Sequence, residues 1–138
     1  SRHDPYISIH VRRGRDYIEY CQSNFQYDLS KCLPTTQELA SKLHHLRMAD
    51  GRLQGLPVYV STDEDRPAEL SEFRALGWQV LDHQALGSSG ALGIFGPWMM
   101  DQVFMSEAYL LIGVQTNSFS RVGAYRQEVW NGKRAVLV

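Results

Sequence analysis

The sequence has 138 residues, 43% of them hydrophobic, which suits a single domain with a sizeable core. Its 14 Lys and Arg residues balance 15 Asp and Glu residues, and a formal net charge of -1 argues against a general nucleic-acid binder. The sequence has neither a run of about 18 apolar residues nor a signal-peptide pattern, so we expect no membrane contact from this segment. Because the first predicted strand follows the N-terminus at once, we interpret the chain as a fragment of a larger protein.

The first apolar stretch ends in a cluster of basic side chains. Alternating apolar residues predict a strand over residues 6–11, and the same period places His10 and Arg12 on one face, roughly 7 Å apart. Arginine keeps its charge and can bind two phosphate oxygens with its planar fork, so an anionic ligand is expected there, with Gly14 allowing a close backbone turn. The residues alone leave an alternative equally open, in which the arginines are solvated loop charges and His10 is packed.

Cys21 and Cys32 lie eleven positions apart in a segment that we expect to be a polar loop. No His or Cys stands beside them at metal-ligand spacing, so the sequence predicts no metal site. A local disulfide is the favoured interpretation, worth roughly 3 kcal/mol by loop closure and implying an oxidising compartment. Two free thiols are the alternative.

Helices and strands alternate along the rest of the chain. The spacing of Thr35 and Glu38 is that of a capping box and predicts a helix over about 35–48. Further strands are predicted at 56–61, 78–81, 110–114 and 135–138. Further helices are predicted from Pro67, from Pro97 and between residue 118 and Gly132, with a flexible glycine-rich loop over 87–96. Strands and helices in this alternation predict an α/β fold, a Rossmann-like parallel sheet with flanking helices.

Ligands of such sheets bind beyond the carboxyl ends of the strands. Candidate side chains follow three of the predicted strands: His10 with Arg12, Thr62 with Asp63, and Asn117 with Ser118 and Phe119.

Small hydroxyl residues at the helix start near 118 would leave backbone N–H groups free to bind an anion. The alternative is simple capping of that helix by Ser118. Asp63 and Asp101 are carboxylates near predicted helix starts, and a carboxylate can accept the two parallel N–H donors of guanine. Phe119 is a candidate to stack on a base or ribose, although core packing is the commoner role of a phenylalanine.

Four motifs in the same order resemble those of the GDP-fucose protein O-fucosyltransferase family. Residues 10–17 resemble its His-x-Arg-x-Gly-x-Asp-aromatic signature, 32–34 its Cys-Leu-Pro, 58–63 its Val-Tyr-Val-Ala-Thr-Asp strand end, and 111–120 its Ile-Gly-Asn-x-x-Ser-Ser-Phe-Thr block. The resemblance spans nearly the whole chain. This sequence departs from the block at Asn117, where the family has Ser, and at Val114, where it usually has Asn.

The resemblance implies the C-terminal, donor-binding half of a GT-B glycosyltransferase. Such an enzyme transfers fucose from GDP-fucose to Ser or Thr hydroxyls of proteins, with inversion and without a metal or other cofactor. The resemblance also implies a location in the endoplasmic reticulum lumen or the Golgi. It places the catalytic Asn and much of the acceptor groove in an N-terminal domain, which we expect as the partner of this domain.

The resemblance also assigns roles to residues. Arg12 would hold the diphosphate as the catalytic residue, with His10 beside it. Asp101 would contact the nucleoside. Ser118 and Phe119 would line the phosphate and nucleoside site, and we add Asp63 and Asn117 to the residues expected to bind GDP-fucose.

Two other functions stay open at this point. An α1,6-type fucosyltransferase acting on glycans shares the His-x-Arg-Arg-Gly motif, but the Cys-Leu-Pro and Asn-Ser-Phe-Ser matches argue against it. A noncatalytic nucleotide-binding or interaction module would need no contact with fucose at all.

Overall fold

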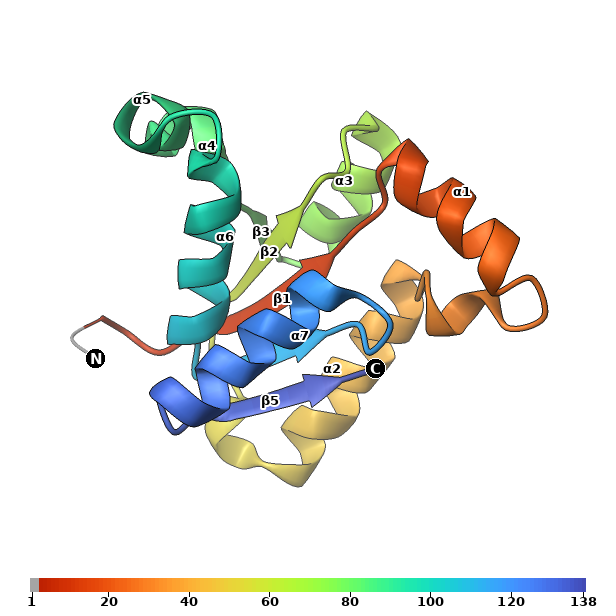
Figure 1. The fold of residues 1–138 in the computed structure, drawn as a ribbon. Helices are drawn as coiled ribbons and strands as arrows, with labels where there is room; N and C mark the ends of the chain where they lie inside the picture. The colour runs from red at the N-terminus through yellow and green to blue at the C-terminus, as the bar shows by residue number, and fades with distance from the viewer. Residues whose placement is uncertain (1–2) are drawn as a thin grey trace.

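The structure, a computed structural model, describes residues 3–138, except for the side chains of residues 91 and 92. It contains one sheet (Figure 1). The strands are β1 (Ile7–Val11), β2 (Val58–Thr62), β3 (Gln79–Val80), β4 (Leu110–Gly113) and β5 (Arg134–Leu137). All neighbouring strands pair in parallel, in the order β3-β2-β1-β4-β5. The predicted Rossmann-like sheet is therefore confirmed, and each predicted strand overlaps an observed one.

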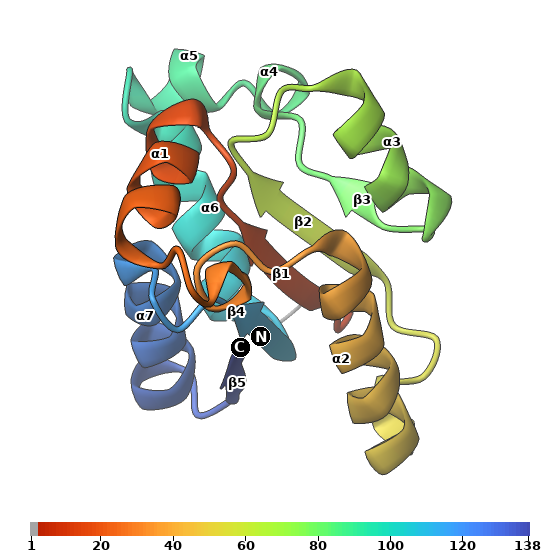
Figure 2. The same cartoon turned by 90° about the vertical axis from the view of Figure 1, so that its right-hand side faces the viewer.

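Helices cover both faces of the sheet (Figures 1 and 2). They are α1 (Arg15–Asn24), α2 (Thr36–Ala49), α3 (Pro67–Ala75), α4 (His83–Leu86), α5 (Ser88–Leu92), α6 (Gly96–Glu107) and α7 (Ser118–Tyr125). Short helical turns are η1 (Leu29–Lys31), η2 (Gly51–Leu53) and the π-helical η3 (Arg126–Trp130). Helices α2 and α3 pack on one face, and α6 and α7 pack on the other. None of the helices that the structure describes is long and apolar enough to cross a membrane.

The main core lies between the sheet and the helices α2 and α3. Every residue of β1 is buried, as expected for a central strand of a parallel sheet that has helices on both faces. The predicted capping box at the start of α2 is present: Thr35 Oγ1 accepts the Glu38 N–H at 3.1 Å, and Glu38 accepts the Thr35 N–H at 2.8 Å. This cap fixes the register in which three leucines of α2 enter the core, namely Leu39, Leu43 and Leu46.

Two segments predicted to be loops are helical. Residues 15–24 form α1, in which only Tyr17 and Cys21 are buried, so the segment has too few apolar positions to show a helical period. In the glycine-rich stretch, residues 88–92 form α5. The preceding helix α4 is capped at both ends. The Asp82 carboxylate caps its N-terminus, and Gly87 ends it with a φ of 67°.

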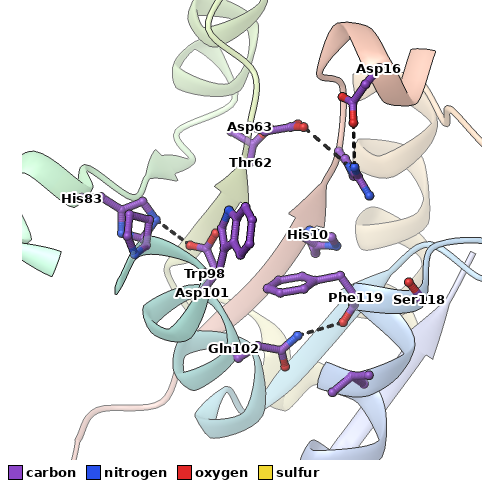
Figure 3. Close-up of a pocket in the computed structure, with 13 residues that line it drawn as sticks. His10, Asp16, Thr62, Asp63, His83, Trp98, Asp101, Gln102, Ser118 and Phe119 are labelled. Atoms are coloured by element: carbon purple, nitrogen blue, oxygen red, sulfur yellow. Dashed lines mark hydrogen bonds and ion pairs between the residues drawn. The ribbon is translucent and has the colours of Figure 1, made fainter. Parts of the chain in front are cut away.

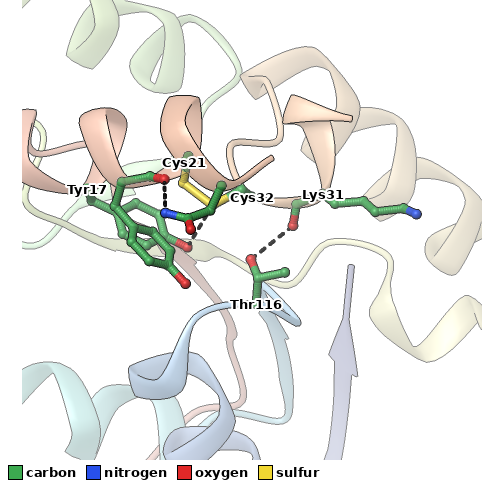
Figure 4. The surroundings of a disulfide bond; sticks show 7 residues. Tyr17, Cys21, Lys31, Cys32 and Thr116 are labelled. Carbon is green, nitrogen blue, oxygen red and sulfur yellow. Dashed lines mark hydrogen bonds between the residues drawn. A yellow bond between two sulfur atoms is a disulfide. The ribbon is translucent and has the colours of Figure 1, made fainter. Parts of the chain in front are cut away.

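The predicted disulfide is present, so the alternative of two free thiols is wrong (Figure 4). Cys21 and Cys32 join α1 to η1 with their Cα atoms 5.7 Å apart. Tyr17 packs on the bond in a small buried cluster. The Thr116 hydroxyl donates to the Lys31 carbonyl at 3.0 Å and links this loop to the segment before α7.

Candidate functional site

The cavity lies where the strand order of the sheet reverses. From β1 the chain moves to β2 and β3 on one side, and then returns to build β4 and β5 on the other. The loops after β1 and β4 diverge at such a switch point and leave a crevice beyond the carboxyl ends of the strands. An open cavity of about 800 Å³ occupies this position (Figure 3).

Six of the seven residues predicted to bind the donor line this cavity: His10, Arg12, Asp63, Asp101, Ser118 and Phe119. The seventh, Asn117, is buried outside the lining, and its Oδ1 accepts the Ser120 N–H at 3.1 Å. Asn117 is thus the cap of α7. The alternative of capping by Ser118 is wrong, because the Asn117 side chain already reaches the third amide of the helix.

Arg12 stands at the cavity between two carboxylates. Its Nη2 lies 3.0 Å from Asp16 Oδ2, and its Nε lies 3.8 Å from Asp63 Oδ2. The guanidinium carbon also lies 4.8 Å from the centre of the Tyr17 ring. These contacts hold the head group in place, and a side chain that is 40% exposed remains open to a ligand. Among the three arginines of the motif, Arg15 is the exposed one.

Arg13 has a structural role on the other side of the loop. Its side chain is buried and donates to Thr36 Oγ1 at 3.0 Å and to the Pro34 carbonyl at 3.1 Å. Its backbone N–H donates to Asp63 Oδ1 at 2.6 Å and so joins the ends of β1 and β2. Gly14 makes this approach possible, because a Cβ at that position would lie 2.5 Å from Asp63 Oδ2. The close backbone turn expected at Gly14 is confirmed.

His10 is mostly buried, and its ring forms part of the cavity floor. Its Nδ1 lies 2.6 Å from Ser120 Oγ, and its ring packs at 5.1 Å against Phe119. Burial, and then the positive charge of Arg12, lower the pKa of His10 to about 4. The imidazole is therefore neutral at neutral pH.

Asp101 on α6 forms the opposite end of the cavity. It is only 8% exposed, and its Oδ1 lies 2.7 Å from His83 Nε2. Burial raises the pKa of Asp101 to about 6, although the contact with His83 opposes this rise. His83 is in turn bonded through Nδ1 to Ser88 Oγ at 3.1 Å. The sequence reasoning missed His83, although it follows the end of a predicted strand, as Thr62 and Asp63 do.

Among the other lining residues missed from the sequence are Trp98 and Gln102 on α6 and Val122 on α7. Trp98 is 63% exposed and offers an aromatic face to a ligand. Gln102 donates to the Phe119 carbonyl at 3.0 Å and ties the two helices together. The sequence gives no local signal for Trp98, because an aromatic residue at a helix start is more often part of a core.

The first turn of α7 adds hydrogen-bond donors to the cavity. The backbone N–H groups of Ser118 and Phe119 have no partner within residues 3–138. Free amides at a helix N-terminus favour an anion. At one end of the cavity, called the cationic end below, Arg12 and the amides of α7 offer donors, and Asp16 and Asp63 pair with the guanidinium. Asp101 forms the anionic end, and aromatic rings flank the space between the two ends. Over residues 3–138, no group of three or more His, Cys, Asp or Glu side chains is arranged to hold a metal ion.

The disulfide supports the cationic end through Tyr17, which contacts both Arg12 and the Cys21–Cys32 cluster. Replacing both cysteines by alanine is expected to lower the free energy of unfolding by roughly 3 kcal/mol, because the unfolded chain loses a closed loop. Urea denaturation measures this change. A reductant should destabilise the unaltered chain by the same amount and leave the variant unaffected. Equal stability of the two proteins would show that the bond does not constrain the chain.

The sheet order and the position of the cavity define a Rossmann-like α/β domain with a ligand crevice at its switch point. Comparison with solved structures finds this fold in POFUT1. The apo form matches with a TM-score of 0.62 at 13% identity, over 98% of this chain and 41% of that chain. POFUT1 in complex with GDP-fucose matches with a TM-score of 0.63 at 12% identity, over 98% of this chain and 42% of that chain. POFUT1 in complex with GDP matches with a TM-score of 0.63 at 12% identity, over 98% and 43% respectively.

No protein-family model and no curated protein matches the sequence. At 12 to 13% identity, the structural likeness establishes the fold. It agrees with the family resemblance that the four sequence motifs indicated. The chain spans about two fifths of the length of the POFUT1 structures that it matches.

Proposed function

We propose that this chain is the GDP-fucose-binding domain of an inverting, metal-independent fucosyltransferase that acts on Ser or Thr hydroxyls of proteins. The observation that carries the proposal is the convergence of Arg12, the free amides of α7 and Asp101 on one cavity at the switch point of the sheet. Each of these groups has a complementary partner in GDP-fucose. The POFUT1 structures with GDP-fucose and GDP, which share this fold, support the choice of ligand.

The cationic end of the cavity suits the diphosphate. In the proposed complex the Arg12 guanidinium exchanges its contacts with Asp16 and Asp63 for phosphate oxygens. The N–H groups of Ser118 and Phe119 donate from the other side. Together these groups supply positive charge at the site of the leaving group, which is the task a metal ion performs in other transferases.

The reaction is a single displacement at the anomeric carbon. A lone pair of the acceptor hydroxyl forms the new bond to fucose C1 as the bond from C1 to the β-phosphate oxygen breaks. Its electron pair leaves with GDP, and the hydroxyl proton is released, so that the products are fucosyl-protein, GDP and a proton. Because negative charge grows on the diphosphate, fixed donors there stabilise the transition state more than the ground state.

The anionic end suits guanine. An ionised Asp101 accepts both the N1–H and the amino group of guanine, whereas adenine presents an acceptor at N1. Trp98 and Phe119 are the rings available for stacking on the base or ribose.

The complete enzyme contains a second domain in this proposal, and the protein acceptor binds between the two. The share of POFUT1 that this chain covers supports that division. We further propose a secretory compartment, the endoplasmic reticulum lumen or Golgi. The Cys21–Cys32 disulfide supports this location, because such bonds persist in oxidising compartments.

Titration calorimetry of the 138-residue chain with GDP, GDP-fucose and ADP tests the proposed ligand. GDP and GDP-fucose should bind with dissociation constants below about 1 mM, and ADP should bind far more weakly. Binding of both guanine nucleotides without transferase activity of the complete protein would point to the noncatalytic module. Equal binding of ADP, or no binding of GDP at millimolar concentration, would contradict the proposal.

A further inference from the structure

His10 and Ser120 form a buried pair between β1 and α7. Ser120 Oγ lies 2.6 Å from His10 Nδ1 and also accepts the Val114 backbone N–H at 3.0 Å. The helix comes this close to β4 because residue 113 is glycine, since a Cβ there would lie 2.9 Å from Ser120 Cβ. Ser120 thus contacts β1 through His10 and the residue after β4 through Val114.

The position of each proton follows from this geometry. A backbone N–H can only donate, so the Val114 contact occupies an acceptor site of Ser120 Oγ. The hydroxyl has one hydrogen to donate, and His10 Nδ1 is the only acceptor found for it in the part of the chain that the structure describes. Nδ1 therefore accepts, and the proton of the neutral imidazole sits on Nε2.

Nε2 is the free donor of this ring. It makes no hydrogen bond within the described range 3–138, and it is not among the buried polar atoms that lack a partner. The ring lines the cavity, as Arg12 does. Figure 3 shows it beside Phe119. An N–H donor therefore faces the same space as the guanidinium.

We propose that Ser120 is a positioning residue that fixes His10 as a neutral Nε2–H donor to the diphosphate of the bound sugar nucleotide. The inference rests on the proposed function for its ligand, but the tautomer itself does not depend on any ligand. A pKa of about 4 keeps His10 uncharged over the physiological range, so the donor does not switch with pH. A donor that is already oriented needs no reorganisation as charge develops on the leaving group.

Nitrogen-15 NMR of the ligand-free chain tests the tautomer directly, because the two ring nitrogens differ in chemical shift when only one is protonated. We expect the His10 ring to be in the Nε2–H form at neutral pH. Ser120→Ala should give a mixture of both tautomers. Ser120→Thr, which keeps the hydroxyl, should retain the Nε2–H form, as should the control Ser71→Ala, which removes a hydroxyl far away on α3.

The second readout is the affinity for GDP-fucose. The Ala variant should bind about tenfold more weakly, and the Thr variant should recover the lost affinity. An Nδ1–H tautomer in the unaltered chain would overturn the inference without affecting the proposed ligand. Weaker binding by the Ala variant with an unchanged tautomer would also overturn it, because Ser120 would then be structural only. Failure of every variant to bind GDP-fucose, with the tautomers as expected, would contradict the proposed function instead.

Discussion

On the proposed function, replacing Arg12 by lysine in the complete protein should lower the rate of fucosyl transfer about 10²–10³-fold, the loss typical of removing one preorganised donor to a developing charge. Lysine keeps the positive charge, but it loses the planar fork with which Arg12 faces Asp16 and Asp63 on two edges. Arg12→Ala should be no better than the lysine variant. Steady-state kinetics with GDP-fucose measures the change as a loss in kcat as well as in kcat/KM.

The matched control is Arg15→Lys, three positions along the same motif. Arg15 is exposed and does not line the cavity, so its replacement should leave the transfer rate within about twofold of the unaltered enzyme. If Arg12→Lys transferred fucose as fast as this control, the guanidinium would not be the diphosphate clamp.

The affinity for GDP-fucose should fall as the pH drops below about 6 and should be constant above it, because the pKa of Asp101 is about 6. Only the carboxylate accepts two N–H groups of guanine, so each pH unit below the pKa should cost about tenfold in affinity. The groups that face Asp101 are His83, which lowers its pKa, and Asp63, which raises it and is itself paired with Arg12. GDP-fucose is the better probe than GDP, whose terminal phosphate titrates in the same range.

Asp101→Asn is the variant that isolates this effect. The amide turns one acceptor into a donor that faces the donors of guanine, so we expect at least about 10²-fold weaker binding at neutral pH. The variant should also lose the change in affinity near pH 6. Asp65→Asn, an exposed carboxylate outside the cavity, is the control and should keep both the affinity and the pH profile. An Asn variant with the pH profile of the unaltered chain would assign the titration to another group.

Much of the fold could be predicted because the strands are short apolar runs between strong helix boundaries. Strand β1 is buried on both faces, and the Thr35 capping box and Pro67 mark where helices α2 and α3 begin. Helix α1 could not be predicted in the same way, because the buried face of this helix is made by the disulfide and Tyr17 rather than by an apolar stripe. That buried face is completed by a bond between residues eleven positions apart.

The cationic end of the site was visible in the sequence because period two places His10 and Arg12 on one face. Only one of the two residues that pair at the anionic end could be predicted from the sequence. Asp101 could be picked as a carboxylate near a predicted helix start and from the family resemblance. Its partner His83 comes from a different helix, α4, and the two side chains meet only in the folded chain. Asn117 is the opposite case. It was predicted to bind the ligand because it is a polar residue inside a motif, but its side chain caps helix α7.

The crystal structure of this chain with GDP-fucose is the most direct test of the proposed site. The account predicts guanine on Asp101, the diphosphate between Arg12 and the N–H groups of Ser118 and Phe119, and His10 Nε2 within hydrogen-bond distance of a phosphate oxygen. A nucleotide bound outside the cavity, or a diphosphate that leaves Arg12 paired with Asp16 and Asp63, would contradict it.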